Sequence, residues 1–215
     1  WKDLGDIYRT RRDITQARAC YEAALRYDPA DFDVREALRQ VRGDPSPFTL
    51  MPLANIDSIL AAERVRDYSS DDAAADAVML HASKQRVVYD GSRSEVREEA
   101  LILITSLDGI DRYIEYTAWR GNRNALTFEK SVVRKPNGRE VSADRDGGFL
   151  VFKTLEVGDV IHVRFRVREA SYGQLAQYMV DDVTFDDAIP VRHASYHLIM
   201  PEGQTFTWRA SNWNA

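Results

Sequence analysis

The stretch "VIHVRFRVRE", residues 160–169, alternates apolar and polar side chains along its whole length. Successive side chains of a β-strand point to opposite faces, so this pattern fits a strand with one apolar and one polar face. Its alternating positions are, on the apolar side, Ile161, Val163, Phe165 and Val167 and, on the polar side, His162, Arg164, Arg166 and Arg168. Such a strand needs a sheet whose apolar face is covered by a second layer.

The same alternation recurs from Ala77 onward, with turn residues about every ten positions. "KPNGRE" predicts a hairpin, because Pro136 presets the turn and Asn137-Gly138 tolerates positive φ. The number of strands predicts a mainly antiparallel β-sandwich, with a single helical turn at "SLDGIDRY". The predicted strands are 77–89, 95–106, 113–119, 126–135, 139–142, 149–154, 160–169, 191–200 and 204–210.

Residues 1–44 have a helical pattern instead. Gly5, Ala17 and Ala24 are small enough to let two helices approach closely, while Asp13 can cap the second helix and Pro29 can end it. The segment resembles a tetratricopeptide repeat, and the residues that match its signature are Trp1, Leu4, Gly5, Tyr8, Ala17, Tyr21 and Pro29.

A single repeat cannot bury its own apolar face, so further repeats are expected upstream. "DFDVREALRQVRGD" has one apolar side and predicts the capping helix that closes the stack. In repeats of this family the first helix lines a concave groove, which implies a partner-binding role for Lys2, Asp6 and Arg9. The alternative is that these three residues form an ordinary solvated helix face.

"GDPSPFTLMP" brings three prolines together, which interrupts helix and sheet and predicts a semi-rigid connection. "NIDSILAAERVRD" then predicts a short amphipathic helix. The whole chain is expected to have an α+β, multidomain fold, a short α-helical hairpin followed by the β-sandwich. Its domains are a repeat with its capping helix at 1–44, a linker with a short helix at 45–76, and the β-sandwich at 77–215.

Three short motifs add a second resemblance: K-P-N-G at 135–138, L-x-V-G-D-V-I at 155–161 and P-x-G at 201–203. They resemble the domain of unknown function 3857, a β-rich bacterial domain that stands before a transglutaminase-like domain. Turns of this kind specify a fold and no chemistry. The resemblance implies a downstream transglutaminase-like domain with a catalytic Cys and His, and an exported location such as the periplasm.

Charge and cysteine content exclude several functions. The formal charge of −5 lies outside the repeat, because residues 1–44 hold 9 basic and 9 acidic residues and the remainder holds 20 against 25. Such an acidic β-domain argues against nucleic acid as the partner. No membrane span is expected, since no run of about 18 apolar residues occurs. Cys20 is the single cysteine, so no disulfide or Cys-based zinc site can form, and its place beside Tyr21 predicts a core residue.

Two groups of residues suggest metal binding. On one strand His193 and His197 would lie about 13 Å apart, too far for one ion. Four acids lack the spacing of a calcium loop and predict a solvated loop: Asp181, Asp182, Asp186 and Asp187. We therefore predict no metal site and no cofactor.

Other polar and aromatic residues give no reactive centre. Glu98 and Glu99 point to opposite faces of a strand and cannot act as a dyad. The tryptophans could stack on sugars, although burial of such rings is commoner: Trp119, Trp208 and Trp213. No catalytic residue is predicted, and the chain by itself is expected not to be an enzyme.

The arginines of residues 160–169 leave two interpretations open. Arg164, Arg166 and Arg168 could join the cations of residues 120–139 in a surface for an anionic partner. They could instead meet water and pair with glutamates of neighbouring strands, such as Glu95, Glu98 and Glu115. Exposed pairs are common and contribute little, which favours the second interpretation.

Two functional hypotheses follow. The first is a non-catalytic interaction and scaffolding module, in which the repeat binds a protein partner and the β-sandwich positions the downstream domain. The second is that the β-domain selects substrate for that domain, by binding a peptide through strand addition or a glycan through stacking.

Overall fold

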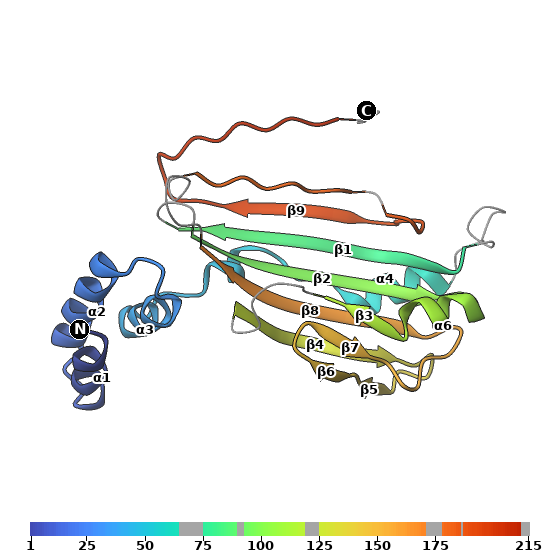
Figure 1. Cartoon of the computed structure of the whole chain (residues 1–215), viewed down its shortest axis with the longest axis horizontal. Helices are drawn as coiled ribbons and strands as arrows, with labels where there is room; N and C mark the ends of the chain where they lie inside the picture. The colour runs from blue at the N-terminus through green and yellow to red at the C-terminus, as the bar shows by residue number, and fades with distance from the viewer. Residues whose placement is uncertain (65–74, 90–92, 119–124, 171–177, 186, 212–215) are drawn as a thin grey trace.

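The computed structural model places three helices at one end of the molecule and two β-sheets at the other (Figure 1). None of the described helices is long and apolar enough to cross a bilayer. The described residues are 1–64, 75–89, 93–118, 125–170, 178–185 and 187–211.

The helical end packs around a contact between two helices. A Cβ on Gly5 would lie 2.5 Å from Cε1 of Tyr21, so only glycine allows this approach. The Tyr21 hydroxyl donates to Asp6 Oδ1 at 2.7 Å, and Asp13 caps the second helix as expected. A helical pair is therefore observed, and its assignment as a tetratricopeptide repeat stays a prediction. The three helices are α1 (Lys2–Thr10), α2 (Ile14–Tyr27) and α3 (Phe32–Arg42).

The main layer of the β-part is a six-stranded sheet in the order β5-β4-β8-β2-β1-β9. Its strands are antiparallel except for the parallel pair β1 and β9, so the sheet is mixed but mainly antiparallel. The strands are β1 (Ala77–Val88), β2 (Ser94–Ile104), β4 (Leu126–Arg134), β5 (Glu140–Ser142), β8 (Val160–Glu169) and β9 (Ala194–Ile199).

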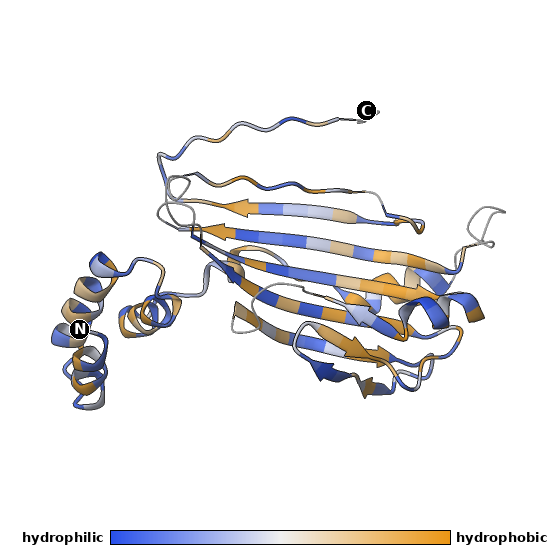
Figure 2. Ribbon diagram, viewed as in Figure 1, coloured by the Kyte–Doolittle hydropathy of each residue, from blue (hydrophilic) through white to orange (hydrophobic). Residues whose placement is uncertain are grey.

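A three-stranded sheet in the order β3-β7-β6 faces one side of the larger sheet. Leu150 and Phe152 are buried against Ile161, Val163 and other apolar residues of the larger sheet. Hydrophobic and hydrophilic residues alternate along strands of the larger sheet (Figure 2). The apolar residues of β8 lie in the core between the two sheets, which confirms the predicted apolar face of this strand. The smaller sheet contains β3 (Glu115–Thr117), β6 (Asp144–Asp146) and β7 (Phe149–Val151), and α6 (Leu107–Tyr113) precedes it.

The opposite side of the larger sheet is covered by helical segments. Ile59 of α4 (Ile56–Arg64) packs with Leu80 and Leu101 near one end. Phe48 of the 3₁₀ helix η1 (Pro47–Leu50) packs with Val87 near the other. The prediction of an α+β fold is confirmed, but a simple sandwich is not what forms, since the second sheet is small and helices cover the other face.

Three strand predictions need correction. Residues 204–210 alternate in sequence but form no strand, because they are exposed and pair with no other described strand. β6 was not among the predicted strands, since "DRD" has no apolar position. The segment predicted as a strand at 113–119 begins at the last residue of α6, and among its described residues, 113–118, the strand is β3.

The hairpin predicted at "KPNGRE" joins β4 to β5, and Gly138 has a φ of +85°. Lys135 at its start places Nζ 2.7 Å from Oδ2 of Asp159, and both side chains are buried. Asp159 also accepts from the Glu156 backbone N–H at 2.7 Å. Two of the three motifs that carry the family resemblance therefore contact each other through one buried ion pair.

Candidate functional site

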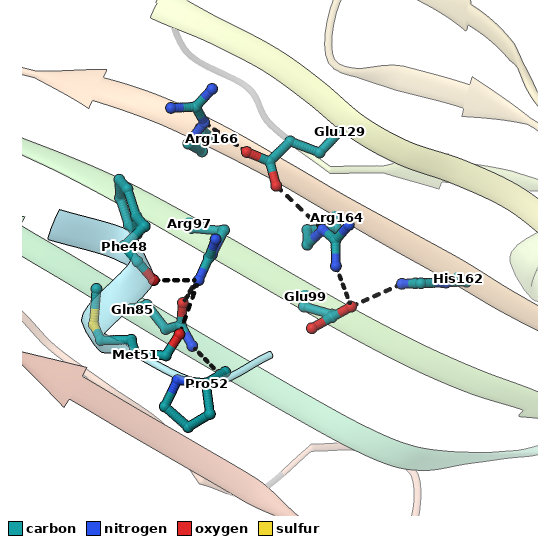
Figure 3. Close-up of polar contacts among 10 residues, drawn as sticks. All are labelled: Phe48, Met51, Pro52, Gln85, Arg97, Glu99, Glu129, His162, Arg164 and Arg166. Carbon is teal, nitrogen blue, oxygen red and sulfur yellow. Dashed lines mark hydrogen bonds and ion pairs between the residues drawn. The ribbon is translucent and has the colours of Figure 1, made fainter. Parts of the chain in front are cut away.

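The polar side of β8 lies on the helix-covered face of the larger sheet, together with polar side chains of β1, β2 and β4. We call this surface the polar face. Its central residues are Gln85, Arg97, Glu99, Glu129, His162, Arg164 and Arg166, drawn with the covering linker in Figure 3.

Glu99 is the buried centre of one half of the polar face. Its Oε1 lies 2.8 Å from Nε2 of His162 and 3.3 Å from Nη1 of Arg164. Burial alone raises the pKa of Glu99, but the His162 hydrogen bond and the Arg164 charge outweigh it and hold that pKa below its ordinary value. Glu99 is therefore ionised at neutral pH and stabilises the two side chains that it contacts.

Glu129 continues this network toward the edge of the sheet. The β4–β8 register shifts between Phe128 and Lys130, which is the site of Glu129. Its carboxylate lies 3.1 Å from Nε of Arg164 and 2.6 Å from Nε of Arg166 (Figure 3). Charges of opposite sign thus alternate along the face, which offsets the cost of burying each of them.

Arg97 fixes the linker to the sheet. Its guanidinium donates to the Gln85 side-chain oxygen and to the backbone oxygens of Phe48, at 3.3 Å, and Met51, at 3.5 Å. Gln85 in turn donates to the Pro52 oxygen at 2.9 Å. Arg97 also lies over the Phe48 ring, 4.8 Å from its centroid, so one buried cation holds the linker at several points.

Arg168 connects the sheet directly to α3. Its Nη1 lies 2.7 Å from Asp33, its Nε lies 3.2 Å from Glu95, and its guanidinium is 5.7 Å from the centroid of the Phe32 ring. The Tyr89 ring lies 6.2 Å from Phe32, in an edge-on arrangement. The helical end is therefore attached to the β-part by side chains as well as by the linker.

The structure settles where the three predicted arginines lie. All three have carboxylate partners, and of the predicted glutamates Glu95 is one of these partners. Glu98 faces the opposite side of the sheet and Glu115 belongs to the smaller sheet. This pairing agrees with the second interpretation, and the three arginine side chains remain 21% to 38% exposed. The sequence did not predict that the linker folds back over the polar face.

The other predicted partner-binding residues lie on α1. Lys2 places Nζ 3.5 Å from Asp31, at the start of α3, and Arg9 lies 3.3 Å from Asp6. Asp6 accepts the Tyr21 hydroxyl, so it has a structural role inside the helical pair. Lys2 and Arg9 keep partly exposed side chains, and their role in binding stays a prediction.

Metal binding finds no support in the part of the chain that the structure describes, since no three ligand side chains come together there. His193 stacks on His81 with ring centroids 5.3 Å apart. Among the acids, Asp181 has a side chain that is only 11% exposed and binds Lys84, Arg86 and Tyr196, which corrects the prediction of a solvated loop for this residue.

The remaining sequence candidates are placed as follows. Cys20 is buried in the helical pair, as expected of a core residue. Glu98 and Glu99 face opposite sides of β2, also as expected. Trp208 is exposed, while Trp119 and Trp213 lie outside the described residues, as does Asp186.

A groove lies where α3, η1 and the larger sheet meet. Its volume is about 620 Å³, within the usual range for ligand sites. The lining includes the Phe48 ring, the Arg97 and Arg166 guanidinium groups, and Glu129. Sequence reasoning missed Gln85, Arg97 and Glu129 as site residues, because the alternation marks them as ordinary polar-face positions and gives no sign of the linker that covers them.

Comparison with known proteins finds that one family model matches part of the chain. Residues 143–215 match the model of the Domain of Unknown Function with solved-structure structure (DUF3857). These residues contain β6, β7, β8 and β9, so the match supports the second resemblance over this part of the chain. No curated protein matched the sequence.

Solved structures similar to the chain include the following example. It is a crystal structure from Parabacteroides distasonis described as a "putative protease", with a TM-score of 0.49 and 16% sequence identity. The similarity covers 60% of this chain and 29% of that chain. A likeness of this size carries no argument about function.

Proposed function

We propose that this chain is a non-catalytic interaction and positioning module, which holds a protein-binding helical pair at a fixed orientation to a β-domain. The observation that carries the proposal is the joint between the two parts. Arg97 and Gln85 bind three backbone oxygens of the linker, and Arg168 binds α3. A flexible tether would need none of these contacts.

The outer surface of the helical pair supports a protein partner. Trp1, Leu4 and Ile7 are exposed at the start of the chain and along α1, and Ile14 is exposed at the start of α2. Neighbouring exposed apolar side chains are typical of surfaces that bind another helix or protein. The tetratricopeptide resemblance implies the same use for Lys2, Asp6 and Arg9.

The β-domain would position a catalytic domain. A transglutaminase-like domain in the same protein is what the family resemblance implies, and the DUF3857 match supports that resemblance only over residues 143–215. In this proposal the catalytic residues belong to that domain, and the present chain sets its orientation to the protein that the helices bind.

The fixed orientation can be tested by spin-label distance measurements. In a Cys20→Ala background, Gln16→Cys on α2 and Asn137→Cys in the β4–β5 turn provide two exposed labelling sites. We expect a narrow distance distribution that Arg97→Ala broadens and Arg209→Ala, at an exposed position, leaves unchanged. A broad distribution in the background protein, or no response to Arg97→Ala, would contradict the proposal.

The second candidate function is substrate selection by the β-domain, and the groove at the joint favours it. In the full-length protein, a β-domain that selects substrate would raise KM when it is replaced by an inert spacer and leave kcat unchanged. A β-domain that only positions its neighbours would leave both constants unchanged when orientation is kept.

A further inference from the structure

The groove at the joint contains a cation whose charge is not neutralised by a bonded carboxylate. Arg97 is 9% exposed, and its described hydrogen-bond partners are all neutral oxygens, from Gln85, Phe48 and Met51. Burying a guanidinium is costly unless an anion accompanies it. Burial accordingly lowers the pKa of Arg97.

Arg97 also has one guanidinium nitrogen, Nη1, that is available to donate hydrogen bonds. Its Nε and Nη2 atoms make the contacts with Gln85 and the linker, while Nη1 makes no hydrogen bond to any residue that the structure describes. Arg97 lines the groove, so this side chain can be reached by a molecule within it. A buried, incompletely paired cation that borders a groove is a feature of anion sites.

The remaining lining indicates which anion would fit. Three arginines, Arg39, Arg97 and Arg166, and two glutamates, Glu36 and Glu129, border the groove, which leaves one net positive charge. A single carboxylate balances this charge, whereas a phosphate dianion would leave the groove with one net negative charge.

Apolar side chains complete the groove beside the cations. The Phe48 ring forms one wall, with Met51 and Leu53 next to it along the linker. The groove can therefore take an apolar side chain next to a carboxylate, a combination that peptides offer and most glycans do not.

We propose that this groove binds a carboxylate of an extended peptide, with Arg97 and Arg166 contacting the anion and Phe48 contacting an adjacent apolar residue. The carboxylate comes either from an acidic side chain or from a peptide C-terminus. This assignment deepens the substrate-selection alternative, and it does not require that the helical pair binds a protein.

Fluorescence anisotropy with short labelled peptides tests the assignment at low salt. One pair compares Ala-Leu-Glu-Leu-Ala with Ala-Leu-Gln-Leu-Ala, both blocked at their ends, and a second compares Ala-Leu-Ala-Leu with a free and an amidated C-terminus. We expect the carboxylate member of at least one pair to bind about tenfold more tightly than its neutral control, and the pair that shows this identifies the source. Equal binding within both pairs, or no binding at all, would overturn the assignment.

Substitutions of two arginines locate the site. Arg166→Gln is expected to weaken binding of the preferred peptide about tenfold, while Arg139→Gln, an exposed arginine in the β4–β5 turn, should have no effect. Circular dichroism of both variants is the control for folding. If Arg166→Gln binds as tightly as the unaltered chain, or if inorganic phosphate at matched ionic strength displaces the peptide, the proposal fails. The spin-label distances are independent of these outcomes, so the two proposals can fail separately.

Discussion

The adjacent residues Glu98 and Glu99 show how one strand places the same chemical group in two environments. Glu99 contacts His162 and Arg164, while Glu98 faces the smaller sheet near Tyr116. Burial raises the pKa of Glu98, with the Lys84 charge only partly opposing it, whereas the partners of Glu99 lower its pKa. The two carboxylates therefore affect the pH dependence of folding stability in opposite directions.

Glutamine at these two positions is predicted to change stability in opposite directions with pH. Because the folded-state pKa of Glu99 is lowered, its stabilisation is complete above the unfolded pKa of about 4.3 and is lost as pH falls through the folded value. Glu99→Gln should therefore cost about 2 kcal/mol in urea unfolding at pH 7, and less below pH 4.

Glu98→Gln is the matched control. Its carboxyl has a raised folded-state pKa, so its favourable contribution exists below about pH 4 and is lost as pH rises through the folded value. This variant should be as stable as the unaltered chain at pH 7, or more stable. If Glu98→Gln lost as much stability at pH 7 as Glu99→Gln, the two glutamates would not differ in environment as described.

Among the elements, the two turns before β5 and β8 depend on each other. Lys135 and Asp159 are buried together, while Glu156, the other carboxylate on Lys135, is mostly exposed. Asp159→Asn is expected to lower the free energy of unfolding by about 3 kcal/mol, because it leaves a buried ammonium group without its main partner. Glu156→Gln should cost less than about 0.5 kcal/mol. Both free energies are measured by urea unfolding. If the two variants lose similar amounts of stability, burial of the ion pair does not determine how much it contributes.

The sequence pattern predicted individual strands and turns well, but it did not predict which segments pack against them. The alternation of "VIHVRFRVRE" predicted the buried face of β8, and Pro136 with Gly138 predicted the hairpin, because both signals are local. Residues 204–210 alternate equally well, yet a strand also needs a neighbouring strand, which local pattern does not report.

For the whole molecule, the arrangement depended on contacts distant in sequence. Arg97 and Phe48 are 49 residues apart, and Arg168 and Asp33 are 135 apart, so no spacing rule connects them. The prolines predicted a semi-rigid linker, but no sequence signal indicated that it would lie on the sheet. The candidate site was therefore predicted only as a row of arginines with one of their carboxylate partners, Glu95, and without the covering segment.

The linker contact also predicts that the stability of the two ends is coupled. Phe48 is 4% exposed and packs with Met51 and Val87 beneath Arg97, whereas Leu50, two residues further along η1, is 74% exposed. Phe48→Ala should cost about 3 kcal/mol at this contact. In hydrogen exchange followed by mass spectrometry, peptides from residues 32–52 should then exchange faster, while those from β4 and β8 keep their protection. Leu50→Ala should leave the whole pattern unchanged. Equal effects of the two variants, or faster exchange spread over β4 and β8, would mean that the linker is not an independent attachment point between helices and sheet.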